Sequence, residues 1–190
     1  HAGFIHALSG TESNYGQQLT NRSNPSVYGL GHFKRETHDH ALQWMLQNGD
    51  ARQKALAEKA LGMPQNGYRD EYGQAIALYA HSLENAATIK SLGQEVTPVS
   101  LNIMHIGGIG DGPRILQAPD NARVSSVTKA DVAGSNPEIF GGTVGQAKSI
   151  IAERLRQRGY SDPGGVMDPD TLESTGRSVE YARYDGPLDS

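Results

Sequence analysis

Helix start and stop residues divide the middle of the sequence into segments of helical length, which constrains the fold more than any other feature. Asp50 opens "DARQKALAEKALG", and Gly62 closes it just before a proline. Thr97–Pro98 opens "TPVSLNIMHIGG", because threonine caps a helix and proline fits its first position. Thr143 and Gln146 form a capping box before "VGQAKSIIAERLRQRG". Strand-like patterning is weak throughout, so the sequence predicts a mainly α fold.

Two further helices complete the expected helical body. The first is "THDHALQWMLQNG", capped by Thr37 and stopped by Gly49. The second is the long segment "DEYGQAIALYAHSLENAATIKSLG", with one apolar stripe made of Tyr72, Ile76, Tyr79 and Leu83. The helix after Thr97 is expected to end at Gly107–Gly108 and to restart near Pro113. Residues 118–142 are expected to be mostly loop.

Length and composition limit the domain organisation and the classes of partner. The chain has 190 residues, and we expect one domain over residues 1–159. Residues 160–190 are rich in Asp, Gly, Pro and Ser and lack an apolar period, so we interpret them as a tail or linker that attaches to a larger protein. A net charge of −4 argues against a nucleic-acid binder, and no apolar run is long enough for membrane insertion. The chain has no cysteine, which excludes disulfides and thiolate zinc sites.

Glu12 is the first candidate for chemistry, since it lies at the end of a predicted helix. Phe4, Leu8 and Glu12 are spaced by four and share one helical face. Burial and the negative end of the helix dipole both favour a protonated carboxyl group, the form that a general acid needs. A glutamate that points into solvent from a helix end is the alternative, and the helix taken alone favours it.

Three other motifs are ambiguous when each is taken alone. The turn "VYGLGHF", with Gly29 and Gly31, allows a ligand to approach the backbone closely, but ordinary tight turns look the same. "MHIGGIGDG" follows a helix and does not fit a phosphate-binding loop, so His105 is either a core histidine or part of a cleft wall. The histidines of "HDH", residues 38–40, are two apart and do not face each other on a helix, so we favour a solvated helix start over a metal site.

The order of these motifs is more specific than any one of them. The pair Glu12–Ser13 is followed by "YGLGHF", then by "VTPVSLNIMHIGGIGDGPRIL", "NPEIF" and "TVGQA". This order resembles the lysozyme-like domain of soluble lytic transglycosylases and goose-type lysozymes, especially the versions carried by bacteriophages. The resemblance spans about residues 3–158 and implies a helical lysozyme-like fold.

The resemblance also implies roles for individual residues. Glu12 matches the catalytic acid and Ser13 its partner. Gly29, Leu30 and Gly31 match a glycine turn that contacts substrate, and His105 and Gly108 match the substrate-contacting residue and trailing glycine of a later helix. His32 stands where the family usually has glutamine, and histidine can also donate and accept hydrogen bonds. Asn102 stands where phage members often have tyrosine.

The implied activity is cleavage of peptidoglycan at the β-1,4 bond between N-acetylmuramic acid and N-acetylglucosamine. One acid without a second carboxylate favours the lytic transglycosylase route, which forms 1,6-anhydromuramic ends without metal or cofactor. A hydrolytic muramidase on the same fold is an alternative, as is a non-catalytic glycan-binding domain of a virion. A helical interaction module explains the motif order less well. The resemblance implies a virion component that acts in the periplasm or cell wall, with glycan strands and other virion or envelope-machine proteins as partners.

Overall fold

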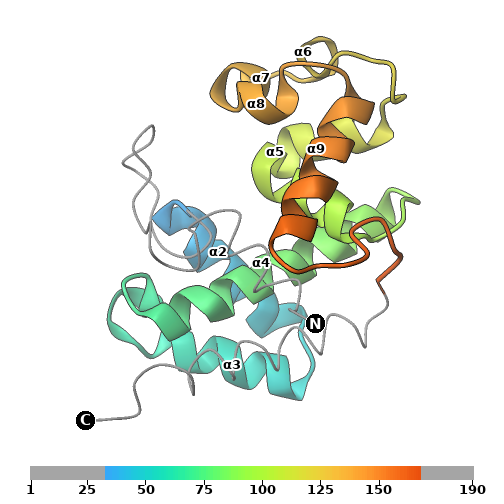
Figure 1. Ribbon diagram of the computed structural model, residues 1–190. Helices are drawn as coiled ribbons and strands as arrows, with labels where there is room; N and C mark the ends of the chain where they lie inside the picture. Colours follow the sequence, from blue (N-terminus) through green and yellow to red (C-terminus); the bar gives the residue numbers. More distant parts are fainter. Residues whose placement is uncertain (1–32, 168–190) are drawn as a thin grey trace. The chain divides into compact units, whose positions relative to one another are not determined.

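The structure, a computed structural model, describes residues 33–167 and is built from helices (Figure 1). The described residues are 71% helical and contain no strand, and one isolated antiparallel bridge joins Arg123 and Thr143. This confirms the predicted mainly α class. The elements are α2 (Arg35–Asn48), α3 (Ala51–Leu61), the 3-10 helix η1 (Pro64–Gly67), α4 (Glu71–Ser91), α5 (Pro98–Gln117), α6 (Val124–Val127), α7 (Val132–Ser135), α8 (Pro137–Phe140) and α9 (Val144–Gln157).

The described chain forms two compact units, residues 33–84 and 85–167, and the boundary between them falls within α4. No helix in the described part is long and apolar enough to cross a membrane.

In the unit of residues 33–84, α2 packs against α3, and the first part of α4 is buried. The α3 boundaries agree with the prediction, because the Asp50 side chain accepts a hydrogen bond from the Gln53 N–H and Gly62 follows the last helical residue. The helix α2 starts at Arg35, so the predicted cap at Thr37 is wrong. The predicted apolar stripe of α4 is too narrow, since every residue from 73 to 80 is buried. A helix buried on all sides needs side chains that are small, apolar or hydrogen-bonded, and Gln74, the polar residue of this run, donates to the Tyr68 carbonyl at 3.1 Å.

Within the "HDH" motif, His38 is buried and holds a turn in place, whereas His40 is exposed, as expected of a solvated helix start. His38 is 1% exposed, and its Nε2–H donates to the Asn66 carbonyl oxygen at 2.7 Å. Gln65 and Asn66 both have positive φ, at 53° and 55°. The Asn66 amide also donates to Asp39 at 3.1 Å. The buried histidine and its neighbour therefore stabilise two left-handed residues that would be strained alone.

In the unit of residues 85–167, α9 packs against α5. Both helices begin as predicted: Thr97 caps α5 with Pro98 at its first position, and Thr143 forms a capping box with Gln146 at the start of α9. Gly159, with φ of +91°, follows the end of α9 as expected of a helix stop. The core of this unit is apolar and includes Ile103, Met104, Ile115, Phe140, Val144, Ile151 and Leu155.

Two stretches outside the long helices are more ordered than the sequence indicates. Residues 118–142 contain the short helices α6, α7 and α8, although more than half of these residues are loop, as expected. After α9, the backbone returns to the start of α5, where the Val99 N–H donates to the Pro163 carbonyl at 3.1 Å. The Met167 N–H donates to the Val96 carbonyl at 2.7 Å, and Met167 is buried.

Candidate functional site

The predicted site residues divide between two parts of the chain. His105 and Gly108 lie on α5, within the described residues. The other predicted site residues, Glu12, Ser13, Gly29, Leu30, Gly31 and His32, lie outside the described residues. Within the described residues, the candidate site therefore consists of α5 and the elements that pack against it in the unit of residues 85–167.

Helix α5 is interrupted at Gly108. This residue has φ of 71° and ψ of −177°, a conformation that only glycine adopts readily. Pro113 lacks the N–H that would bond to the Ile109 carbonyl, so the helix that resumes after Gly108 has one backbone hydrogen bond fewer in its first turns. The predicted break at Gly107–Gly108 is confirmed, but the helix resumes directly after it and not near Pro113.

The break also requires a close approach of two backbone segments. A Cβ atom placed on Gly107 would lie 2.9 Å from the backbone nitrogen of Gly112. A methyl group at that position would clash, so the two turns of α5 on either side of Gly108 fit together because Gly107 has no side chain. Backbone geometry within α5 thus explains Gly107 and Gly108 of "MHIGGIGDG", whereas nothing in the structure requires glycine at Gly110.

The side chains around the break range from buried to fully exposed. Met104 is 1% exposed and Asn102 4% exposed, so both belong to the interior. His105 is half-buried, so it is not a fully enclosed core histidine. Ile109 is 80% exposed. The break therefore has one exposed apolar side chain, Ile109, and a half-buried histidine one turn before it.

Asp111 is a buried carboxylate that the sequence analysis missed. It is 3% exposed and accepts hydrogen bonds from the backbone N–H groups of Lys129, at 2.8 Å, and Ala130, at 2.9 Å. Arg114 donates a third at 3.3 Å. Burial favours the neutral acid, but the two backbone donors and the guanidinium of Arg114 outweigh it and hold the pKa of Asp111 below its usual value.

The Asp111 carboxylate ties the segment after α6 to the part of α5 that follows the break. Its backbone partners are 18 and 19 residues away, and no local spacing signals such a contact. Arg114, three residues along the helix, was the one sequence hint that Asp111 is ionised.

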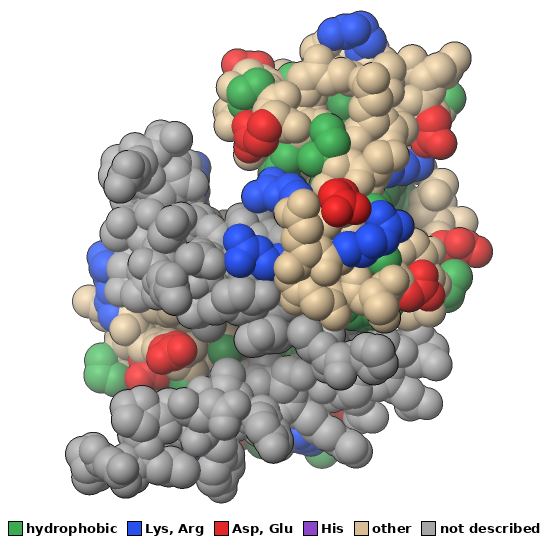
Figure 2. All heavy atoms as spheres, in the orientation of Figure 1, with side chains coloured by type: hydrophobic (Ala, Val, Ile, Leu, Met, Phe, Trp, Pro, Cys, Tyr) green, Lys and Arg blue, Asp and Glu red, His purple; other side chains and the backbone are tan. Residues whose placement is uncertain are grey.

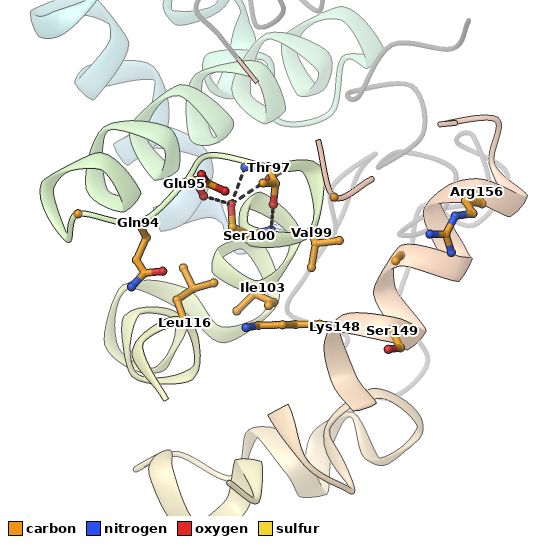
Figure 3. Close-up of a pocket in the computed structure, with 13 residues that line it drawn as sticks. Gln94, Glu95, Thr97, Val99, Ser100, Ile103, Leu116, Lys148, Ser149 and Arg156 are labelled. Carbon is orange, nitrogen blue, oxygen red and sulfur yellow. Dashed lines mark hydrogen bonds between the residues drawn. The ribbon is translucent and has the colours of Figure 1, made fainter. Parts of the chain in front are cut away.

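A cavity of about 580 Å³ lies between the α4–α5 connection, α5 and α9 (Figure 3). Its charged lining residues are Lys148 and Arg156 from α9 and Glu95 from the connection. Basic side chains also group around α9 on the surface in Figure 2. A second hollow of about 490 Å³ lies between α8 and α9 and has no cationic lining residue.

The described residues hold no cluster of three or more side chains suited to a metal ion. No protein-family model matches the sequence, and no curated protein or solved structure is significantly similar to it.

Proposed function

We propose that the chain is a peptidoglycan-cleaving lytic transglycosylase with a lysozyme-like helical fold. The observation that carries the proposal is the order of the motifs: Glu12–Ser13, the glycine turn at residues 29–31, and the later helix with His105 and Gly108. The described part of the chain supports it in two respects. The later helix begins at Thr97–Pro98 and is interrupted at Gly108, and the half-buried His105 lies three residues before the break.

In the proposed reaction, the Glu12 carboxyl group donates its proton to the glycosidic oxygen. The acetamido group of the muramyl sugar supports the developing positive charge. The Glu12 carboxylate then removes the proton from the C6 hydroxyl group of the same sugar, which attacks C1 and closes the 1,6-anhydro ring. His105 and Gly108 contact the substrate in this proposal.

Asp39 on α2 and Asp111 on α5 are both engaged with protein donors, which fits a mechanism with one acid. Most glycosidases place a second carboxylate across the scissile bond. Asp111 is buried, and its oxygens already accept three hydrogen bonds. Asp39 is held by Arg35 at 3.0 Å and by the Asn66 amide. Neither aspartate is therefore suited to serve as the second carboxylate.

Digestion of purified peptidoglycan tests the proposal, with released muropeptides identified by mass spectrometry. We expect anhydro-muropeptides from the parent chain and none from Glu12→Gln. Glu58→Gln, which changes an exposed glutamate on α3, is the matched control and should act like the parent. Products that are one water heavier would identify a muramidase. If neither protein releases products while the parent still sediments with the wall, the chain is a non-catalytic glycan-binding domain.

We further propose that this activity belongs to a larger phage virion protein that opens the cell wall locally. The motif order, which resembles the phage members of the family, supports this context. Immunoblotting of purified virions for the chain tests it, and absence of the chain from the particle would contradict it.

A further inference from the structure

The cavity between α5 and α9 has a cationic group above an apolar floor at one end. Figure 3 shows the Lys148 side chain extending from α9 beside Ile103 and Leu116, with its ammonium group on the side of Gln94. The methylene stem of a lysine packs well on such apolar side chains while its charged end stays accessible. The Gln94 amide adds a neutral polar group that can donate to an anionic ligand.

A second cation lies farther along the same face of α9. Arg156 is eight residues after Lys148, with the small residue Ala152 halfway between them, and all three line the cavity. Eight residues correspond to a rise of about 12 Å along a helix. An extended peptide advances about 3.3 Å per residue, so three to four residues cover that distance. This rise separates the two Cα atoms, and because both side chains are long, their charged ends can each meet one carboxylate of an extended peptide a few residues long.

Both cations can change partners at little cost. The Lys148 ammonium lies 2.8 Å from Asp120, whose side chain is 71% exposed. Arg156 lies 3.5 Å from Glu153, whose side chain is 60% exposed. Exposed ion pairs of this kind are worth about 0–1 kcal/mol each, so a ligand carboxylate can replace the protein carboxylate.

Glu95 is the acidic residue among those that line the cavity. Figure 3 shows it beside Thr97 and Ser100, away from Lys148. The Ser100 hydroxyl is already engaged with the Glu95 carbonyl at 3.0 Å and with the α5 cap. Ligand binding thus depends on the two cations, and Glu95 opposes an anion at one edge.

We propose that this cavity binds a short acidic peptide and, resting on the proposed function, that the peptide is the stem attached to the glycan strand of peptidoglycan. The Lys148 ammonium and the Arg156 guanidinium each bind one carboxylate of the stem. The cavity thereby holds the peptide part of the wall.

Fluorescence anisotropy with a glycan-free stem peptide tests this inference without requiring cleavage. The probe is L-Ala-γ-D-Glu-L-Lys-D-Ala-D-Ala, labelled at its amino end with an uncharged fluorophore, with free carboxylates on its second and fifth residues. We expect the parent to bind it, and Lys148→Gln and Arg156→Gln each to weaken binding roughly threefold to fivefold, as an exposed ion pair allows. The double variant should lose about tenfold or more. Glu95→Gln should instead tighten binding, because it removes a repulsive charge.

The control variant carries Lys54→Gln and Lys129→Gln, two exposed lysines that do not line the cavity. It changes the net charge by the same amount as the double cavity variant and should bind like the parent. The probe with both carboxylates converted to carboxamides should not bind. Equal binding by the parent and the double cavity variant, or no binding by the parent, would overturn the inference.

The outcome is independent of the cleavage assay. Loss of peptide binding in the double cavity variant supports the inference even if no muropeptides are released. Muropeptide release without peptide binding would leave the transglycosylase proposal standing and refute the inference.

Discussion

Replacing Asp111 with asparagine should destabilise the unit of residues 85–167 by a predictable amount. The asparagine oxygen can accept from one of the two backbone N–H groups, of Lys129 or Ala130, but its NH₂ group faces the other donor. One charge-assisted hydrogen bond is lost, at about 1.5–3 kcal/mol, and the other becomes neutral, at about 0.5–1 kcal/mol. The free energy of unfolding should therefore fall by about 2–4 kcal/mol.

Thermal unfolding and hydrogen exchange measure this change. For a chain of this size, 1 kcal/mol corresponds to about 2–4 °C, so Asp111→Asn should lower the Tm by roughly 4–16 °C. The amides of Lys129 and Ala130 should exchange faster in the variant. The difference in unfolding free energy between the parent and Asp111→Asn should be full at pH 7 and shrink below about pH 4. A carboxyl whose folded pKa is depressed contributes stability above its unfolded pKa, and this contribution is lost as the pH falls through the folded pKa.

Asp120→Asn is the matched control, since Asp120 is an exposed aspartate in an ion pair with Lys148. It should change the free energy of unfolding by less than about 1 kcal/mol. A change below about 0.5 kcal/mol for Asp111→Asn at pH 7, or unaltered exchange at residues 129 and 130, would refute the argument that this carboxylate anchors the segment.

Two further predictions concern the unit of residues 33–84. Gly73→Ala should cost about 1–3 kcal/mol, because the new Cβ would lie 2.5 Å from the backbone of Gly67. Gly62→Ala is the control, because φ is −79° there and the nearest atom lies 3.4 Å from the new Cβ. Its free energy of unfolding in urea should stay within about 1 kcal/mol of the parent's. Equal effects of the two variants would contradict this reasoning. Burial lowers the pKa of His38 below 6.5, so the unfolded state binds more protons, and stability should be full above pH 6.5 and fall as the pH drops below it. Between pH 7.5 and pH 5.5, the free energy of unfolding measured in urea should fall less for His38→Gln than for the parent. An equal fall for both proteins would show that the Asn66 turn does not depend on neutral His38.

The sequence by itself determined the helical class and most helix ends within the described residues. Caps such as Thr97 with Pro98, and Thr143 with Gln146, depend on side chain to backbone bonds within three residues, so they can be recognised without tertiary information. The break at Gly108 was also predictable, because a glycine can adopt a positive φ through its own backbone alone. The start of α2 was not, since Lys34 provides no side-chain cap.

Tertiary structure decided the features that join distant parts of the chain. The sequence placed His38 at a solvated helix start, but its hydrogen bond to Asn66 spans 28 residues and buries it. Asp111 likewise finds its backbone donors beyond the next helix. The cavity exists only where α5 and α9 pack together, so Lys148 and Arg156 gave no signal as lining residues until both helices were in place. Local bonds fix where helices begin and end, whereas burial and charge pairing depend on which helices meet.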